Sequence, residues 1–303
     1  MRPIYWFAII VASLGWAYGA IGTRLAYGED VGPWTQVGMR ISIAAVLVAL
    51  IIVVRKIPMP SRAELKYGLN QAIFNLTIPY VLFTFAYDEA SAGFVGLLAA
   101  LIPISTAAFA NFMLRDEKLT FAKFIGLFVA FTGVAALLLS GDSGLSEGGR
   151  PVVAVGLGLT AVASIGYAGA FAKKHTGEYN PTMLTGLQFG YATIWLLVAM
   201  LAIEGLPTDV SGAGWAIIIS MAVASTVLPF LILFWLYKHI SATDASLTGY
   251  LVPFITLAGG LLLLDEELQR GIIIGGILVL IGIVLADLDT RRRAKKAPAE
   301  TVV

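Results

Sequence analysis

The sequence contains no cysteine and only two histidines, and 13% of its residues are charged. Disulfides and thiolate metal sites are therefore excluded, and His175 and His239 form no metal-ligand spacing. A soluble domain carries about 25% charged residues, so this protein's surface is not adapted to water. The net charge of +1 provides no basic face for a nucleic acid. We expect no metal, no cofactor and no nucleic-acid partner.

What the sequence has in abundance is apolar residues, 58% of the total, with a mean hydropathy of +0.87. A membrane-spanning helix needs about 20 of them in succession. The N-terminal segment after Arg2 resembles a signal peptide, but its apolar run continues towards Leu25 and we interpret it as an uncleaved first span. The pattern predicts an all-α integral membrane protein with ten transmembrane helices, at about 3–24, 33–54, 67–87, 91–114, 121–140, 151–173, 181–203, 213–237, 243–264 and 270–288.

The distribution of Lys and Arg between alternate loops predicts the orientation of these spans. One set of loops, together with the two ends of the chain, holds sixteen of these residues, and the other set holds three. Cytoplasmic loops of membrane proteins carry the excess of positive charge. Both termini are therefore expected in the cytoplasm.

The segment from Pro79 to Glu117 returns as Pro229 to Glu267, at an offset of 150 residues and without a gap. The matched pairs include Pro79 with Pro229, Tyr87 with Tyr237, Ser91 with Ser241, Pro103 with Pro253 and Glu117 with Glu267. Each half then has five spans, an odd number, so the second copy must enter the membrane inverted, as in known transporter architectures. We expect a first five-helix repeat at 1–141, a linker at 142–150, a second, inverted repeat at 151–289, and a basic cytoplasmic tail at 290–303. The polar end of this tail, after its basic residues, is expected to be disordered.

Each half has a proline-bearing helix, a Ser-Ala turn, a second proline and a closing acidic pair. In this arrangement the chain resembles the EamA-type drug/metabolite transporter superfamily over about residues 3–288. In that superfamily the motif that closes the fourth span is usually a small residue followed by an acidic one, and Arg115-Asp116-Glu117 fits it loosely. Within the superfamily the chain looks most like bacterial exporters of aromatic amino acids, which also pass flat aromatic cations such as methyl viologen.

The resemblance implies a transporter of small amphipathic metabolites in the bacterial cytoplasmic (inner) membrane, working by alternating access around a midplane cavity. Amino acids, with aromatic ones preferred, are the expected substrates; the alternatives are other amino acids of the threonine or homoserine kind, and organic cations or drugs. An intramembrane enzyme would need a catalytic set such as His-Glu-x-x-His or paired aspartates, and none occurs. The expected partners are the solute and the lipid bilayer, with no sign of an obligate protein partner.

Spans one and six correspond at an offset of 151 residues, which matches Ser13 with Ser164 and Trp16 with Tyr167. Ser13 and Trp16 share one helix face, and Ser164 and Tyr167 share another, because residues three apart on a helix are neighbours. Two such faces at the midplane would bind a flat solute by stacking; alternatively, these aromatic residues only pack or face lipid.

Four prolines are candidate hinges, because each frees a carbonyl and bends its helix; alternatively, they only shape static packing. They are Pro79, Pro103, Pro229 and Pro253. Beside them lie four further candidate substrate-binding residues, Asn75, Tyr80, Ser246 and Tyr250. Asn75 is equally compatible with a hydrogen bond between helices.

Arg40 is the only basic residue well inside a span, about 10 Å from the outer end at 1.5 Å per residue. It would bind a substrate carboxylate, or it occupies a polar packing position that Gln188 fills in the second half. No Asp or Glu lies near the middle of any predicted span. A proton-driven pump normally keeps such a group in the membrane, so we hypothesise facilitated transport.

Overall fold

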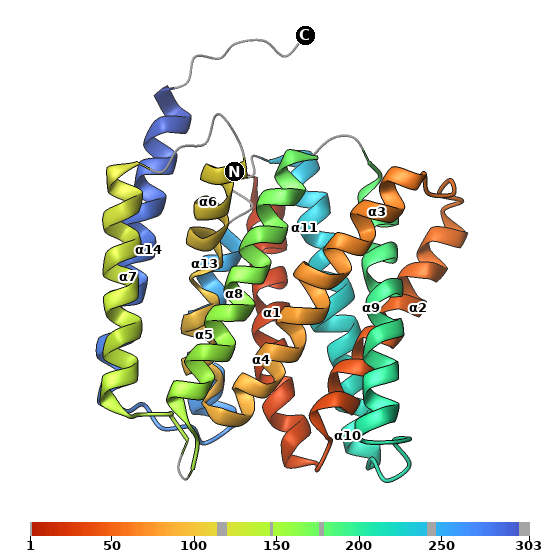
Figure 1. Ribbon diagram of the computed structural model, residues 1–303, viewed down its shortest axis with the longest axis horizontal. Coiled ribbons are helices and arrows are strands. Elements are labelled where there is room, and N and C mark those ends of the chain that lie inside the picture. The colour runs from red at the N-terminus through yellow and green to blue at the C-terminus, as the bar shows by residue number, and fades with distance from the viewer. Residues whose placement is uncertain (1, 114–119, 146–147, 176–178, 241–246, 297–303) are drawn as a thin grey trace.

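The computed structural model describes residues 2–113, 120–145, 148–175, 179–240 and 247–296, and every regular element within them is helical (Figure 1). The first half contains α1 (Pro3–Gly28), α2 (Pro33–Val54), α3 (Arg62–Gln71), η1 (Ala72–Thr77), α4 (Ile78–Glu89), α5 (Ala92–Ala99), α6 (Ile102–Met113) and α7 (Phe121–Ser140). The second contains α8 (Pro151–Lys174), α9 (Pro181–Ile203), α10 (Gly212–Ser220), η2 (Met221–Val227), α11 (Leu228–His239), α13 (Leu247–Leu263) and α14 (Arg270–Lys296). The all-helical class expected from the sequence is therefore confirmed for these residues.

Seven of the described helical stretches are long and apolar enough to cross a membrane: Pro3–Gly28, Pro33–Val54, Arg62–Glu89, Ala92–Met113, Pro151–Ala172, Pro181–Ile203 and Gly212–Leu233. Three shorter apolar helices accompany them, Phe124–Ser140, Leu251–Leu263 and Arg270–Leu285. Several stretches join two or three helical segments end to end, such as α3, η1 and α4.

The helices begin where the sequence supplies the right first residues. Proline occupies the start of α1, α2 and α9, where its missing N–H is not needed. The side chains of Ser61, Ser91, Asn180 and Ser211 accept hydrogen bonds from the first turns of α3, α5, α9 and α10.

Helix α14 extends beyond the last predicted span, which was expected to end at about residue 288. It continues to Lys296 and so includes the basic residues of the predicted tail. Arg and Lys are good helix formers, and positive charge is favourable at a helix C-terminus. Residues 297–303, which form the polar end expected to be disordered, lie outside the described part of the chain.

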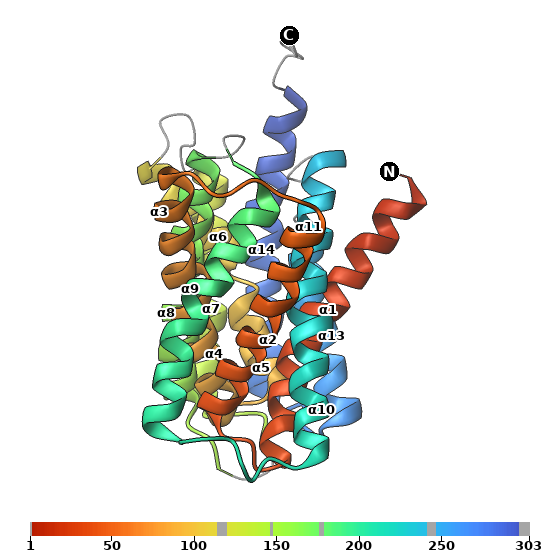
Figure 2. The same ribbon diagram turned by 90° about the vertical axis from the view of Figure 1, so that its right-hand side faces the viewer.

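The helices of the two halves pack in a reciprocal arrangement (Figures 1 and 2). Helix α1 packs against η2, α11 and α13, and its counterpart α8 packs against η1, α4 and α6. The remaining helices pair directly across the halves, α2 with α9 and α7 with α14. The first helix of each half is thus enclosed by the third and fourth spans of the other.

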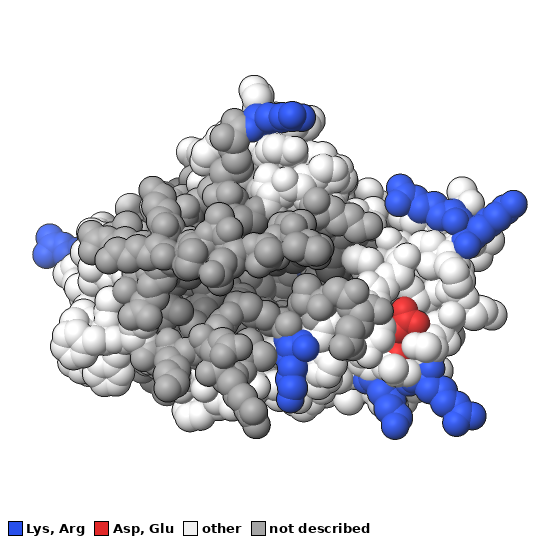
Figure 3. Space-filling view, turned by 90° about the horizontal axis from the view of Figure 1, so that it is seen from above, with Lys and Arg blue, Asp and Glu red and all other residues white. Residues whose placement is uncertain are grey.

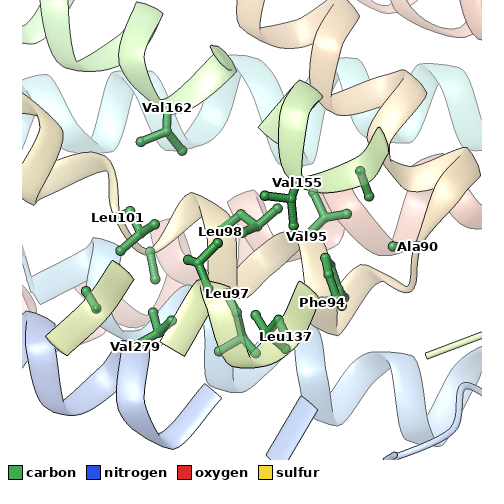
Figure 4. Close-up of a cluster of buried hydrophobic side chains, with 14 of the residues drawn as sticks. Ala90, Phe94, Val95, Leu97, Leu98, Leu101, Leu137, Val155, Val162 and Val279 are labelled. Carbon is green, nitrogen blue, oxygen red and sulfur yellow. The ribbon is translucent and has the colours of Figure 1, made fainter. Parts of the chain in front are cut away.

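The largest buried apolar cluster surrounds α5 (Figure 4). Phe94, Val95 and Leu98 of this helix are fully buried. Their surroundings come from helices of both halves and include Leu137 of α7, Val155 and Val162 of α8, and Val279 of α14. This cluster fixes α5 between the two halves.

The start of α1 and the end of α14 lie at the same end of the bundle (Figure 1). Lys and Arg side chains stand round the rim of this end, with little Asp or Glu among the described residues visible there (Figure 3). The opposite end carries the acidic residues Glu29, Asp88, Glu204 and Glu266, which follow or end helices there.

The pairing of α7 with α14 depends on glycines that bring the two backbones together. A Cβ at Gly133 would stand 2.6 Å from the carbonyl oxygen of Gly275 and 2.7 Å from the backbone nitrogen of Val279. Small residues allow this close approach in membrane helices.

We expect Gly133→Ala to destabilise the protein by roughly 1–3 kcal/mol, because the added methyl group meets backbone that cannot move aside. Thermal unfolding in detergent would measure the effect. Gly156→Ala on α8 is the matched control, since no atom lies within 4 Å of its Cβ position. Equal stability of the two variants would contradict the close backbone packing.

Candidate substrate site

Two π-helical segments, η1 and η2, lie in corresponding places in the two halves, each ending just before a proline. The N–H of Ile78 bonds to the carbonyl of Ile73, five residues back, and that of Leu228 to Val223. The next residues in this register are Pro79 and Pro229, which have no N–H to donate. The carbonyl oxygens of Phe74 and Ala224 are thereby freed within the interior of the bundle.

The two halves accommodate the freed carbonyls differently. Ser164 of α8 donates from Oγ to the Phe74 oxygen at 2.7 Å. The Ala224 oxygen instead faces Gly15 of α1, where a Cβ would stand 2.5 Å from it. Ser13, the counterpart of Ser164, donates to the carbonyls of Ile9 and Thr248. The sequence-predicted serines are therefore both inside the bundle, but as hydrogen-bond donors to backbone.

Arg40 of α2 is buried, with 7% exposure, and its guanidinium contacts η2. Its Nε donates to Thr226 Oγ1 at 2.8 Å, and its Nη2 lies 3.5 Å from the carbonyl oxygen of Ser225. The guanidinium carbon stands 5.0 Å from the ring centroid of Tyr80, within the range of a cation–π interaction. The structure thus brings together Arg40 and Tyr80, two of the predicted site residues.

A second polar pair occupies the related position in the other half. Asn75 of η1 donates from Nδ2 to Oε1 of Gln188 on α9, at 3.2 Å. Gln188 is buried, with 4% exposure. Asn75 therefore makes the hydrogen bond between helices that was one of its two predicted roles.

The predicted aromatic residues of α1 and α8 belong to different groups of rings. Trp16 meets Phe230 edge to face at 6.4 Å, and Phe230 meets Phe189 at 5.5 Å. Tyr167 lies 4.7 Å from Phe74 in an edge-to-face contact, and its hydroxyl accepts from Asn70 Nδ2 at 3.2 Å. Tyr167 thus contacts a ring of the π-helix η1, whereas Trp16 contacts a ring in the first turn of α11, just after η2.

The four predicted hinge prolines occupy three kinds of position. Pro79 and Pro229 follow the π-helices, and Pro103 is the second residue of α6, just after the break that separates this helix from α5. Pro253 lies inside the continuous helix α13. Of the remaining predicted residues, Ser246 lies outside the described part of the chain, as does the side chain of Tyr250.

Several residues near Arg40 were not predicted from the sequence. Phe230 follows Pro229 as Tyr80 follows Pro79, so the repeat alone would have indicated it. Gln36, one turn before Arg40, donates to Thr23 Oγ1 at 3.2 Å and accepts from Thr84 at 3.4 Å. Gln36 could have been predicted from the sequence, because it lies one turn before Arg40 on the same face of the helix.

The acidic end of the bundle is held by two buried or partly buried carboxylates that cap helices. Glu204 accepts from the backbone N–H groups of Trp34 and Thr35 at the start of α2, at 2.9 and 2.7 Å. Glu266 accepts from Ala92 N–H at the start of α5 at 2.7 Å, and lies 3.7 Å from Arg24 Nε. Negative charge is favourable at a helix N-terminus, so each carboxylate ties a helix of the first half to the second.

A polar cavity of about 340 Å³ opens at this end, beside Arg24 and Glu266. Burial raises the pKa of the Glu266 carboxyl above its ordinary value, against the lowering effect of its backbone hydrogen bonds. Among the described residues, no group of three or more His, Asp or Glu side chains is arranged to hold a metal ion.

Comparison with known proteins gives a consistent result. The EamA-like transporter family matches the chain twice, over residues 3–139 and 152–286. The uncharacterized transporter YoaV of Bacillus subtilis (strain 168) is 26% identical over 289 residues, which cover 94% of this chain and 97% of that protein. An uncharacterized transporter of Archaeoglobus fulgidus is 27% identical over 279 residues, covering 92% and 96%. A solved crystal structure aligns with a TM-score of 0.62 at 17% identity, over 96% of this chain and 100% of that chain, which is a likeness of fold.

We expect Ser164→Ala to cost roughly 1–3 kcal/mol of stability, because it leaves the Phe74 carbonyl without a donor. In a Pro79→Ala background the restored N–H would satisfy that carbonyl, so the same serine substitution should cost less. A double-mutant cycle on thermal unfolding measures this coupling. Thr160→Ala is the control, since its hydroxyl bonds within α8; an equal cost of Ser164→Ala in both backgrounds would contradict the interpretation.

The raised pKa of Glu266 predicts a pH dependence with a definite sign. The folded state favours the protonated carboxyl, so this group's stabilising contribution is present at low pH and is lost as pH rises through its raised pKa. Glu266→Gln removes that titration. The stability of the variant relative to the native protein should therefore increase as pH rises above about 4.5, measured as the difference in melting temperature; a constant difference would contradict this.

Proposed function

The chain belongs to the EamA-like transporter family and is a multi-pass membrane transporter, and we propose that it carries amino acids, with a preference for aromatic ones. The relatives' names say only that they are uncharacterized transporters. The substrate class therefore rests on the chemistry of the residues around the two π-helices.

The observation that carries the proposal is the meeting of aromatic and polar groups at one level of the bundle. Tyr80 and Phe230 directly follow the prolines that end the π-helices. Tyr80 lies 5.0 Å from the Arg40 guanidinium, and Phe230 contacts Trp16. Aromatic side chains bind a flat solute by stacking or by edge-to-face contact. Polar groups at the same level would hold the backbone of an amino acid.

We propose further that all ten apolar helical stretches cross the membrane as two inverted five-helix repeats with cytoplasmic termini. The reciprocal packing of α1 and α8 supports this, as do the matched π-helices and the two separate matches to one family. The basic rim at the end where α1 begins favours the cytoplasmic side. Rocking of one repeat against the other would then alternate access to the central residues.

The proposed location is the bacterial cytoplasmic membrane, with the solute and the lipid bilayer as partners. Transport is proposed to be facilitated, driven by the substrate gradient. In support, the buried carboxylates Glu89 and Glu266 lie at or beyond helix ends among the described residues, where they cap or pair with neighbours. A requirement for an imposed pH gradient in reconstituted protein would refute this form of coupling.

We expect Trp16→Ala to weaken phenylalanine counterflow in proteoliposomes roughly 2- to 10-fold, the loss of about one aromatic contact worth 0.5–1.5 kcal/mol. Labelled phenylalanine outside would be followed with unlabelled phenylalanine, tryptophan, threonine or buffer inside. Trp195→Ala is the matched control, because that ring is 48% exposed on the outside of the bundle.

Three other results would each remove a different part of the proposal. Equal exchange with threonine would remove the aromatic preference. An equal loss in the Trp195 variant would remove the role of Trp16. No exchange with any of these amino acids, in folded protein, would remove amino acids as the substrate class.

A further inference from the structure

Arg40 is a positively charged residue buried inside a membrane-spanning helix, where a charge is energetically unfavourable. It lies seven residues after the first residue of α2, about 10 Å into the span at 1.5 Å per residue. It is 7% exposed, so it does not reach the membrane surface as a snorkelling side chain does. A charge at this depth costs several kcal/mol unless something compensates it.

The protein supplies only part of that compensation. A guanidinium has five N–H donors, and within the described residues Arg40 uses Nε and Nη2, the second at a long 3.5 Å. The two ion pairs among the described residues join Arg24 to Glu266 and Arg150 to Glu89, so no described carboxylate lies within 4 Å of the Arg40 nitrogens. The charge is therefore hydrogen-bonded on one side and faces the ring of Tyr80, and it has no counter-ion among the residues that the structure describes.

At the related site in the other half, a neutral residue links the corresponding helices. Gln188 on α9 meets Asn75 of η1 as Arg40 on α2 meets Thr226 of η2. A neutral amide therefore links the second helix of one half to the π-helix of the other. Arg40 makes the same link, and adds a charge that the link does not require.

On the side of α1 the guanidinium packs against a glycine. Gly19 is directly beside it, since a Cβ at that position would stand 3.2 Å from Nη2. Trp16 lies one turn away on the same helix, about 4.5 Å along its axis. The cation beside Gly19 and the aromatic contact of Trp16 with Phe230 are thus separated by about one turn of α1.

We propose that Arg40 binds the carboxylate of the transported solute and restricts the site to monocarboxylates and zwitterionic amino acids. This inference rests on the proposed function, of which it names the substrate class. A carboxylate accepts two parallel N–H bonds from a guanidinium and supplies the missing negative charge. The same cation repels organic cations, which therefore are not substrates of the native protein.

The test compares each acid with its neutral or carboxylate-free analogue, so that a single chemical group changes. Purified protein in detergent is heated with 3-phenylpropanoate or 3-phenylpropanamide, and with L-phenylalanine or L-phenylalaninamide. The acids should raise the melting temperature of the native protein, because a ligand that binds only the folded state stabilises it, and the amides should raise it much less. In Arg40→Gln this difference should vanish, and Arg40→Lys should retain part of it.

Counterflow provides the second measurement. Arg40→Gln should lower phenylalanine exchange roughly 10- to 100-fold, the effect of losing hydrogen bonds to a charged group worth about 1.5–3 kcal/mol. Phenylalaninamide should compete poorly in the native protein and relatively better in Arg40→Gln. Gln188→Ala is the control, because Gln188 is the neutral residue at the corresponding position in the other half. This variant should keep the preference for acid over amide.

Different outcomes separate this inference from the proposed function. Acids that stabilise the native protein but not Arg40→Gln, without any counterflow, would keep the carboxylate site and refute amino acid transport. Counterflow that is equal in the native protein and Arg40→Gln would keep the transporter and overturn the carboxylate site. Amides that bind the native protein as well as the acids do, or equal losses for acid and amide in Arg40→Gln, would also overturn it and leave Arg40 as a brace for η2.

Discussion

A proline in the middle of a membrane helix removes one N–H donor, and no water is present in hydrocarbon to replace it. This constraint acts at Pro79 and Pro229, and much of the centre of the protein follows from it. The backbone before each proline forms a π-helix, and one carbonyl oxygen in each π-helix contacts a neighbouring helix instead of a backbone N–H. The Phe74 oxygen accepts a hydrogen bond from the hydroxyl of Ser164, and the Ala224 oxygen lies against Gly15. π-Helical segments are rare in proteins, and those that occur are often found at functional sites.

The two halves use the same framework with different chemistry. At η2, Arg40 donates a hydrogen bond to Thr226, and the Ala224 carbonyl oxygen lies against Gly15. At η1, the side-chain amides of Asn75 and Gln188 bond to each other, and Ser164 donates to the Phe74 carbonyl. A symmetric pair of identical sites would suit a symmetric solute. An amino acid has a charged end and a side chain, so the unequal sides of this centre fit it better.

Part of this centre was accessible from the sequence. The repeat at an offset of 150 residues indicated Pro79 and Pro229, and Arg40 was evident as a lone basic residue inside an apolar span. The role of Ser164 could not be predicted from the sequence. Its acceptor is a backbone carbonyl ninety residues away in the chain, freed by a proline on another helix. Trp16 and Tyr167 are related in sequence, yet they contact different rings, because α1 and α8 each pack against the third and fourth spans of the opposite half.

The sequence by itself determined the class of the protein, because apolar runs of this length fold as helices in a bilayer. It also determined where the helices begin, since proline and N-capping residues act on their own first turns. Only the tertiary structure decided which polar groups satisfy one another, for example that Arg40 meets Thr226 rather than a carboxylate. Local pattern sets the conformation of each span, but the partner of a buried polar group depends on which helices pack together, and that is a property of the whole chain.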